Sequence, residues 1–144
     1  MPQEKLAKIL GYAGLIPFVF FSVISWLNFQ FMKEPHYYLM TYAAIILSFM
    51  GAIHWGVAMS VKNDKANFQL GISVIPSLLG WFALLLPSIY GYSILIISFS
   101  LLCLLDKEQN KRGVFPAWYY PMRVILTAIV VLCLIISSLA LAVR

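Results

Sequence analysis

Five apolar segments, each long enough to cross a bilayer, divide this chain and limit its possible folds more than any other feature. A membrane-spanning helix needs about 20 mainly apolar residues, and only short polar stretches separate the segments. The predicted spans cover residues 6–31, 37–61, 68–86, 89–105 and 120–143. The sequence therefore predicts an all-α, polytopic membrane protein, a single domain over residues 1–144 in which five transmembrane helices form a compact bundle.

The composition agrees with a bilayer as the main partner of this chain. Hydrophobic residues make up 62% of the sequence and charged residues 10%, against about 45–50% and about 25% in soluble domains. The net charge of +5 comes from cations in loops and at helix ends. No basic groove or nucleic-acid-reading motif accompanies them, so we expect no nucleic-acid partner.

The cations also predict an orientation, because an odd number of spans places the two termini on opposite sides. Lys33 and Arg144 fall on one side of the predicted bundle. The other side carries Lys5, Lys8, Lys62, Lys65, Lys107, Lys111, Arg112 and Arg123. Since basic residues concentrate in cytoplasmic loops, we expect a cytoplasmic amino terminus.

Small residues recur at every fourth position of the second predicted span and indicate a face that packs against other helices. Small side chains let helix backbones approach closely inside a membrane. Prolines and glycines in the first and third spans predict kinks that serve the same close packing. The predicted packing positions are Gly14, Pro17, Ala44, Ser48, Ala52, Gly56 and Pro76.

His54 lies inside the second apolar segment, where a titratable ring is costly and usually faces a bundle interior or a cavity. Two interpretations stay open: a structural hydrogen bond between helices, or a functional group in a cytoplasmic-leaflet pocket. His36 belongs to the opposite loop, and no carboxylates pair within the membrane. We therefore predict no metal, no cofactor and no catalytic residue.

Two charged residues flank the last polar loop. Asp106 follows the fourth predicted span, and a solvated position at the helix end is expected; the alternative is an ion pair with Lys107, Arg112 or Arg123. Arg123 begins the fifth span. It either extends to the interface as an orienting cation or clamps a lipid phosphate or another anionic ligand.

Polar and aromatic residues at a similar depth define a candidate ligand-binding site. Its predicted members are His54, Trp55, Tyr12, Arg123 and Trp118. We expect non-enzymatic binding of a lipid or other hydrophobic small molecule there, or an accessory role in a complex with a membrane-protein partner. The alternative is a small transporter or channel that uses His54 as a proton-sensitive group. An enzyme is disfavoured, because HExxH, GxSxG and phosphate-binding glycine motifs do not occur.

Three short motifs, at residues 10–17 (LGYAGLIP), 53–56 (IHWG) and 116–119 (PAWY), together with the following Arg123, carry a resemblance over nearly the whole chain. The series resembles the small integral-membrane family of bacteria and mitochondria that includes transmembrane protein 69 of animals. The resemblance implies a compact helical inner-membrane protein and supplies no substrate or reaction. It picks out Tyr12, Gly14, Pro17, His54, Trp55, Gly56, Trp118 and Arg123. Because no targeting extension precedes the first span, we expect the bacterial cytoplasmic membrane.

Overall fold

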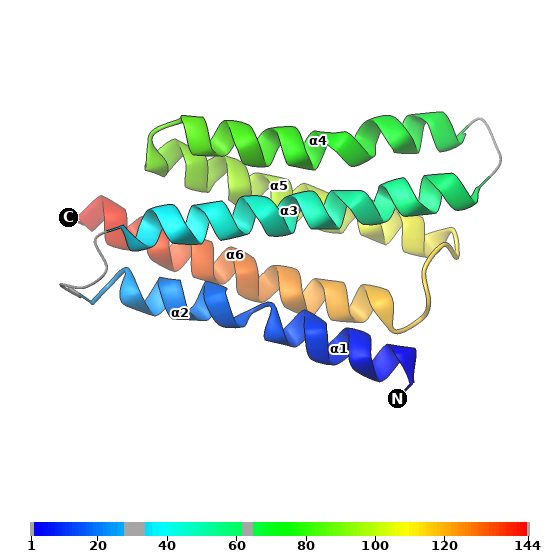
Figure 1. Ribbon diagram of the computed structural model, residues 1–144, viewed down its shortest axis with the longest axis horizontal. Helices are drawn as coiled ribbons and strands as arrows, with labels where there is room; N and C mark the ends of the chain where they lie inside the picture. Colours follow the sequence, from blue (N-terminus) through cyan, green and yellow to red (C-terminus); the bar gives the residue numbers. More distant parts are fainter. Residues whose placement is uncertain (1, 28–33, 62–64, 144) are drawn as a thin grey trace.

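Helices account for nearly all of the described chain, and they lie side by side along one direction (Figure 1). This computed structural model describes residues 2–27, 34–61 and 65–143. The elements are α1 (Gln3–Ala13), α2 (Ile16–Ile24), α3 (Pro35–Ser60), α4 (Lys65–Leu85), α5 (Ser88–Lys111) and α6 (Tyr119–Val143). Within these ranges, five helical segments are long and apolar enough to cross a membrane: Gln3–Ile24 and each of α3 to α6. The predicted all-α fold with five spans is confirmed; residues 28–31 of the first predicted span lie outside the described residues.

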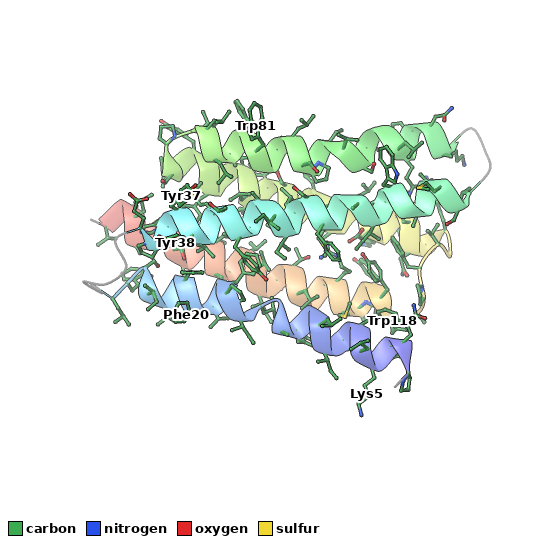
Figure 2. All side chains as sticks on the ribbon, viewed as in Figure 1. Lys5, Phe20, Tyr37, Tyr38, Trp81 and Trp118 are labelled. Carbon is green, nitrogen blue, oxygen red and sulfur yellow. The ribbon has the colours of Figure 1, made fainter. Side chains whose placement is uncertain are left out.

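The chain reverses direction from one span to the next (Figure 1). The start of α1, the end of α3, the start of α4 and the α5–α6 connection lie at one end of the bundle, here called the amino-terminal end. The end of α2, the start of α3, the α4–α5 connection and the end of α6 lie at the opposite end. Lys5 and Trp118 lie toward the amino-terminal end, and Tyr37 and Tyr38 lie near the other (Figure 2).

The first span is broken into α1 and α2, as Pro17 predicts. Proline has no N–H, and its ring clashes with the carbonyl four residues earlier; that residue is Ala13, where α1 ends. The hydroxyl of Tyr42 on α3 donates to the carbonyl oxygen of Gly14 at 2.9 Å. A side chain of the neighbouring helix therefore satisfies one backbone group that the break exposes. None of the residues of α1 is buried.

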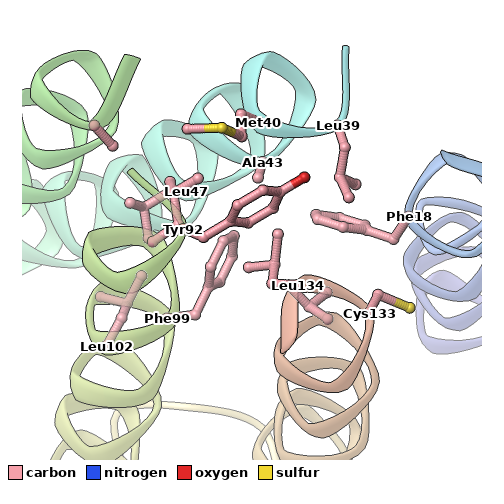
Figure 3. Packing of buried hydrophobic residues seen from close by; sticks show 13 residues of the cluster. Phe18, Leu39, Met40, Ala43, Leu47, Tyr92, Phe99, Leu102, Cys133 and Leu134 are labelled. Atoms are coloured by element: carbon pink, nitrogen blue, oxygen red, sulfur yellow. The ribbon is translucent and has the colours of Figure 1, made fainter. Parts of the chain in front are cut away.

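The apolar core lies between α2, α3, α5 and α6 (Figure 3). Phe18 from α2, Leu47 from α3 and Leu134 from α6 meet around the rings of Tyr92 and Phe99 from α5. All five side chains are at most 1% exposed. This layer of apolar and aromatic side chains fills the interior and separates the two ends of the bundle from each other.

Helices α3 and α4 pack closely through small residues. A Cβ added to Gly51 would meet the carbonyl oxygen of Ser73 at 2.6 Å, and one added to Gly80 would meet Ala44 at 3.2 Å. Pro76 is also buried in this contact, within an α4 that continues through it.

The small residues that recur at every fourth position of α3 lie only partly in its contact with α4. Ala44 is buried and Ser48 partly buried, but Ala52 and Gly56 are exposed, and nothing lies within 4 Å of a Cβ added to Gly56. A row at i, i+4 advances about 40° per step around the helix, so it drifts off the packed face. The buried positions of α3 instead alternate between steps of three and four residues, from Ala44 and Leu47 through Gly51 and His54 to Ala58.

Candidate functional site: a buried ionic network beside an apolar cavity

Asp106 lies inside the bundle because α5 does not stop where the apolar run stops. The helix continues to Lys111 through Lys107, Glu108 and Gln109, residues that favour helix. Asp106 is therefore more than a turn from the end of its helix and is 1% exposed. The expectation of a solvated charge at the helix end was wrong, and the alternative ion pair with Arg123 is present.

Three helices meet at the Asp106 carboxylate. Its Oδ1 lies 2.8 Å from Nε2 of His54 on α3, and its Oδ2 lies 2.7 Å from Nε of Arg123 on α6. His54 and Arg123 are 1% and 4% exposed. Charge-assisted hydrogen bonds of this kind are stronger than neutral ones. Hence His54 belongs to a buried network built on the ion pair between Asp106 and Arg123.

A fourth helix completes the hydrogen bonding of His54. A carboxylate only accepts hydrogen bonds, so Nε2 of His54 carries a hydrogen and donates it to Asp106. The amide nitrogen of Gln69 on α4 lies 3.5 Å from the other ring atom, Nδ1. Through this contact α4 joins the network. Phe115 covers the imidazole edge-to-face, with ring centroids 6.1 Å apart.

Because the two oxygens of the Asp106 carboxylate bind different residues, one nitrogen of Arg123 is left without a partner. Nε and Nη2 lie along the same edge of the guanidinium, the edge that often binds both oxygens of a carboxylate. Asp106 supplies one oxygen to Nε and gives the other to His54. Nη2 of Arg123 is buried, and no hydrogen-bond partner is found for it among the described residues.

A cavity of about 610 Å³ adjoins Arg123. Side chains of α1, α2, α3, α5 and α6 line it, and almost all of them are apolar. Arg123 is the one charged residue in the described lining. Leu10, Ile45 and Phe49 belong to the lining and are 63%, 60% and 61% exposed. The cavity therefore reaches the outer surface of the bundle between α1 and α3.

Two buried polar atoms without a partner both belong to residues that line this cavity. Within the described ranges they are Nη2 of Arg123 and Oγ1 of Thr127, and no other buried side-chain nitrogen or oxygen is unpaired. The two residues are one helical turn apart on α6 and lie on the same face. Because an unpaired buried polar group costs about 1–3 kcal/mol, two beside one cavity mark its polar end.

The structure brings together only some of the predicted site residues. Arg123 and Trp118 line the cavity, and Trp118 lies where α6 begins (Figure 2). His54 lies behind them and reaches Arg123 only through Asp106. Tyr12 and Trp55 are 42% and 47% exposed and do not line the cavity.

Sequence reasoning missed Gln69 and Thr127, and it left Asp106 at the surface. The helix-forming residues after Asp106 are a signal that could have placed it inside α5. Thr127 follows Arg123 by one turn, which places both on one helix face. Gln69 carried no such signal. Across the described part of the chain, no group of three or more His, Cys, Asp or Glu could hold a metal ion.

These features define a class: a multi-pass helical membrane protein with a buried His–Asp–Arg network next to an apolar, partly open cavity. Comparison with known sequences gives the family. Residues 3–139 match the family described as protein of unknown function (DUF3429), and the chain belongs to it.

Transmembrane protein 69 of Xenopus tropicalis is 32% identical to this chain over 134 residues, which cover 91% of the chain and 53% of that relative. The chain thus spans about half the length of this curated relative. The resemblance inferred from the three motifs is confirmed. No solved structure matches the chain.

Proposed function

We propose that this protein binds an amphiphilic, membrane-soluble molecule, a lipid or another hydrophobic small molecule, in the cavity beside Arg123. The observation that carries the proposal is the position of the two unpaired polar atoms. Nη2 of Arg123 and Oγ1 of Thr127 are buried, unpartnered and on residues of one cavity lining. A ligand with an apolar body and one polar end satisfies both the lining and these atoms.

The size and place of the cavity support this proposal. Binding sites for small molecules typically enclose about 300–1,000 Å³ and combine apolar walls with a few polar groups; this cavity encloses about 610 Å³. The exposed lining residues Leu10, Ile45 and Phe49 lie on helices that span the membrane. Their exposed surface faces the acyl chains, so a ligand enters sideways from the bilayer.

The core argues against the alternative of a channel or transporter. A path for ions or protons needs polar groups or water along its length. Between the Asp106 network and the opposite end stand Phe18, Phe99 and Leu134, each at most 1% exposed (Figure 3). We therefore favour binding over transport.

A pair of tryptophan substitutions tests the proposal. Ala7 lines the cavity, and Ala13 lies on the same helix, exposed and outside the lining. Native mass spectrometry of the protein in a mild detergent should show a bound hydrophobic molecule in the wild type and in Ala13→Trp. Ala7→Trp should lose it at unchanged thermal stability. Equal occupancy in both variants, or a co-purifying protein in place of a small molecule, would contradict the proposal.

We also propose that the amino-terminal end of the bundle faces the cytoplasm of a bacterium. Lys5, Lys8, Lys107 and Lys111 lie toward that end, and basic residues favour the cytoplasmic side. In a variant with Cys103 and Cys133 replaced by serine, single cysteines at Lys111 and Ser88 report the two ends. An impermeant thiol reagent on intact cells should label Ser88→Cys and not Lys111→Cys; the reverse would overturn the orientation.

A further inference from the structure

We infer that the polar end of the bound molecule is a neutral oxygen acceptor, of the ketone, quinone or ester carbonyl class, and not an anionic headgroup. The inference rests on the proposed function and names its ligand class. Hydrogen-bond direction, charge and the geometry of the guanidinium each support it.

The direction of the hydrogen bonds in the Asp106 network requires that the ligand supply an acceptor. His54 donates to Asp106, and Arg123 donates to the same carboxylate from the other side. Each oxygen of the Asp106 carboxylate therefore already accepts a hydrogen bond from a protein side chain. On the residues that line the cavity, two buried polar atoms have no partner within the described chain: Nη2 of Arg123, which can only donate, and the hydroxyl oxygen of Thr127. A ligand oxygen that accepts from both satisfies the two orphaned groups together.

Charge favours a neutral ligand. The positive charge of Arg123 is already balanced by Asp106 at 2.7 Å. The other charges on α1 and at the end of α5 are not buried: Lys8 pairs with Glu4 and Lys111 with Glu108, and Lys107 and Arg112 are exposed. An anionic headgroup would therefore leave one uncompensated negative charge in a buried site, which is strongly unfavourable.

The geometry of the Arg123 guanidinium also favours a single neutral oxygen acceptor. Arginine holds carboxylates and phosphates best through two parallel N–H groups of one edge. On the Nε–Nη2 edge of Arg123, Asp106 occupies Nε. A single donor remains on that edge, which suits one carbonyl oxygen.

Three probes of equal chain length test the inference: an alkane, a methyl ketone and a fatty acid. Binding to the purified full chain in detergent is measured by native mass spectrometry at about pH 9, where a carboxyl is ionised and an ordinary imidazole is neutral. One hydrogen bond from a charged donor should make the ketone bind about tenfold tighter than the alkane or more. The ionised fatty acid should bind at least about tenfold more weakly than the ketone.

Thr127→Val removes the hydroxyl at nearly constant shape and should weaken ketone binding roughly fivefold without affecting the alkane. Thr41→Val is the matched control, because the hydroxyl of Thr41 donates to the carbonyl of Tyr37 and Thr41 lies outside the cavity lining. Asp106→Asn makes the site net positive and should reverse the preference toward the fatty acid.

The outcomes separate the inference from the function on which it rests. If none of the probes binds the wild type, the proposed function fails. If the fatty acid binds wild type most tightly, or the ketone and the alkane bind equally, the cavity binds ligands but the inferred headgroup class is wrong. Because the probe comparison uses the wild type, it holds even if Asp106→Asn does not fold.

Discussion

Asp106 and Arg123, seventeen residues apart in the sequence, form an ion pair inside the bundle, with Oδ2 and Nε 2.7 Å apart. Both side chains are at most 4% exposed, although each lies next to a polar loop in the sequence. The pair joins α5 to α6 at the level where His54 approaches from α3. It therefore positions three helices and leaves Nη2 of Arg123 for the cavity.

Removing either partner of this pair should destabilise the protein strongly. Asp106→Ala leaves a buried arginine without its counter-charge, and loss of one partner of a buried pair typically costs about 3–5 kcal/mol. Thermal unfolding in detergent should show a large fall in Tm for Asp106→Ala and for Arg123→Ala.

The double variant Asp106→Leu, Arg123→Met is the control for this prediction, since it removes both charges and refills the volume. It should recover much of the lost stability, because an apolar replacement of a buried pair is often neutral or stabilising. A double variant less stable than both single variants would contradict the buried-pair interpretation.

Replacing His54 should lower both stability and ligand occupancy. In His54→Ala, Oδ1 of Asp106 loses its donor, and the carboxylate is free to close on both Nε and Nη2 of Arg123. We expect a loss of about 1–3 kcal/mol and reduced co-purification of the bound molecule. In His54→Gln a side-chain N–H is retained, and occupancy should stay closer to wild type. Unchanged stability and occupancy in His54→Ala would show that the histidine does not act through Asp106.

Two glycines of α3 should respond in opposite ways to alanine. At Gly51 the new Cβ would lie 2.6 Å from a backbone oxygen of α4, so α3 and α4 must move apart, at a cost of about 1–3 kcal/mol. At Gly56 the space is open, and alanine should be neutral or stabilising by up to about 1 kcal/mol. Unfolding of the two variants in detergent compares them directly; equal losses would place Gly56 in a contact that the structure does not contain.

Two tryptophans should differ in their effect on ligand occupancy. Trp118 lines the cavity, whereas Trp55 is exposed and lies outside the lining. Trp118→Ala should remove part of the wall and lower the amount of bound molecule several-fold, and Trp55→Ala should leave it unchanged. Native mass spectrometry measures both, and a larger loss in Trp55→Ala would move the site to the outer face of α3.

Local patterns were enough to predict the spans and the break in the first one. Apolar runs of bilayer length become helices because the bilayer offers no other partners for the backbone. Pro17 ends α1 at Ala13 for a reason confined to the backbone within one turn. Both effects act over short stretches of sequence, so a single sequence contains them.

The site depends on relations between helices that a single span does not reveal. The depth of Asp106 follows from the full length of α5, and its partners come from α3 and α6. The exposed positions of Ala52 and Gly56 follow from the rotation of α3 against α4. Arg123 and Trp118 could be picked out by residue type and depth, but the cavity beside them is formed by side chains of five helices.

The buried network also has an electrical consequence. Within the described chain its two opposite charges, on Asp106 and Arg123, cancel within one hydrogen-bond length. A transmembrane potential does work on net charge moved through the membrane, and this pair presents only a dipole. The Asp106–Arg123 pair can therefore lie inside the membrane field without the potential pushing or pulling it as a unit.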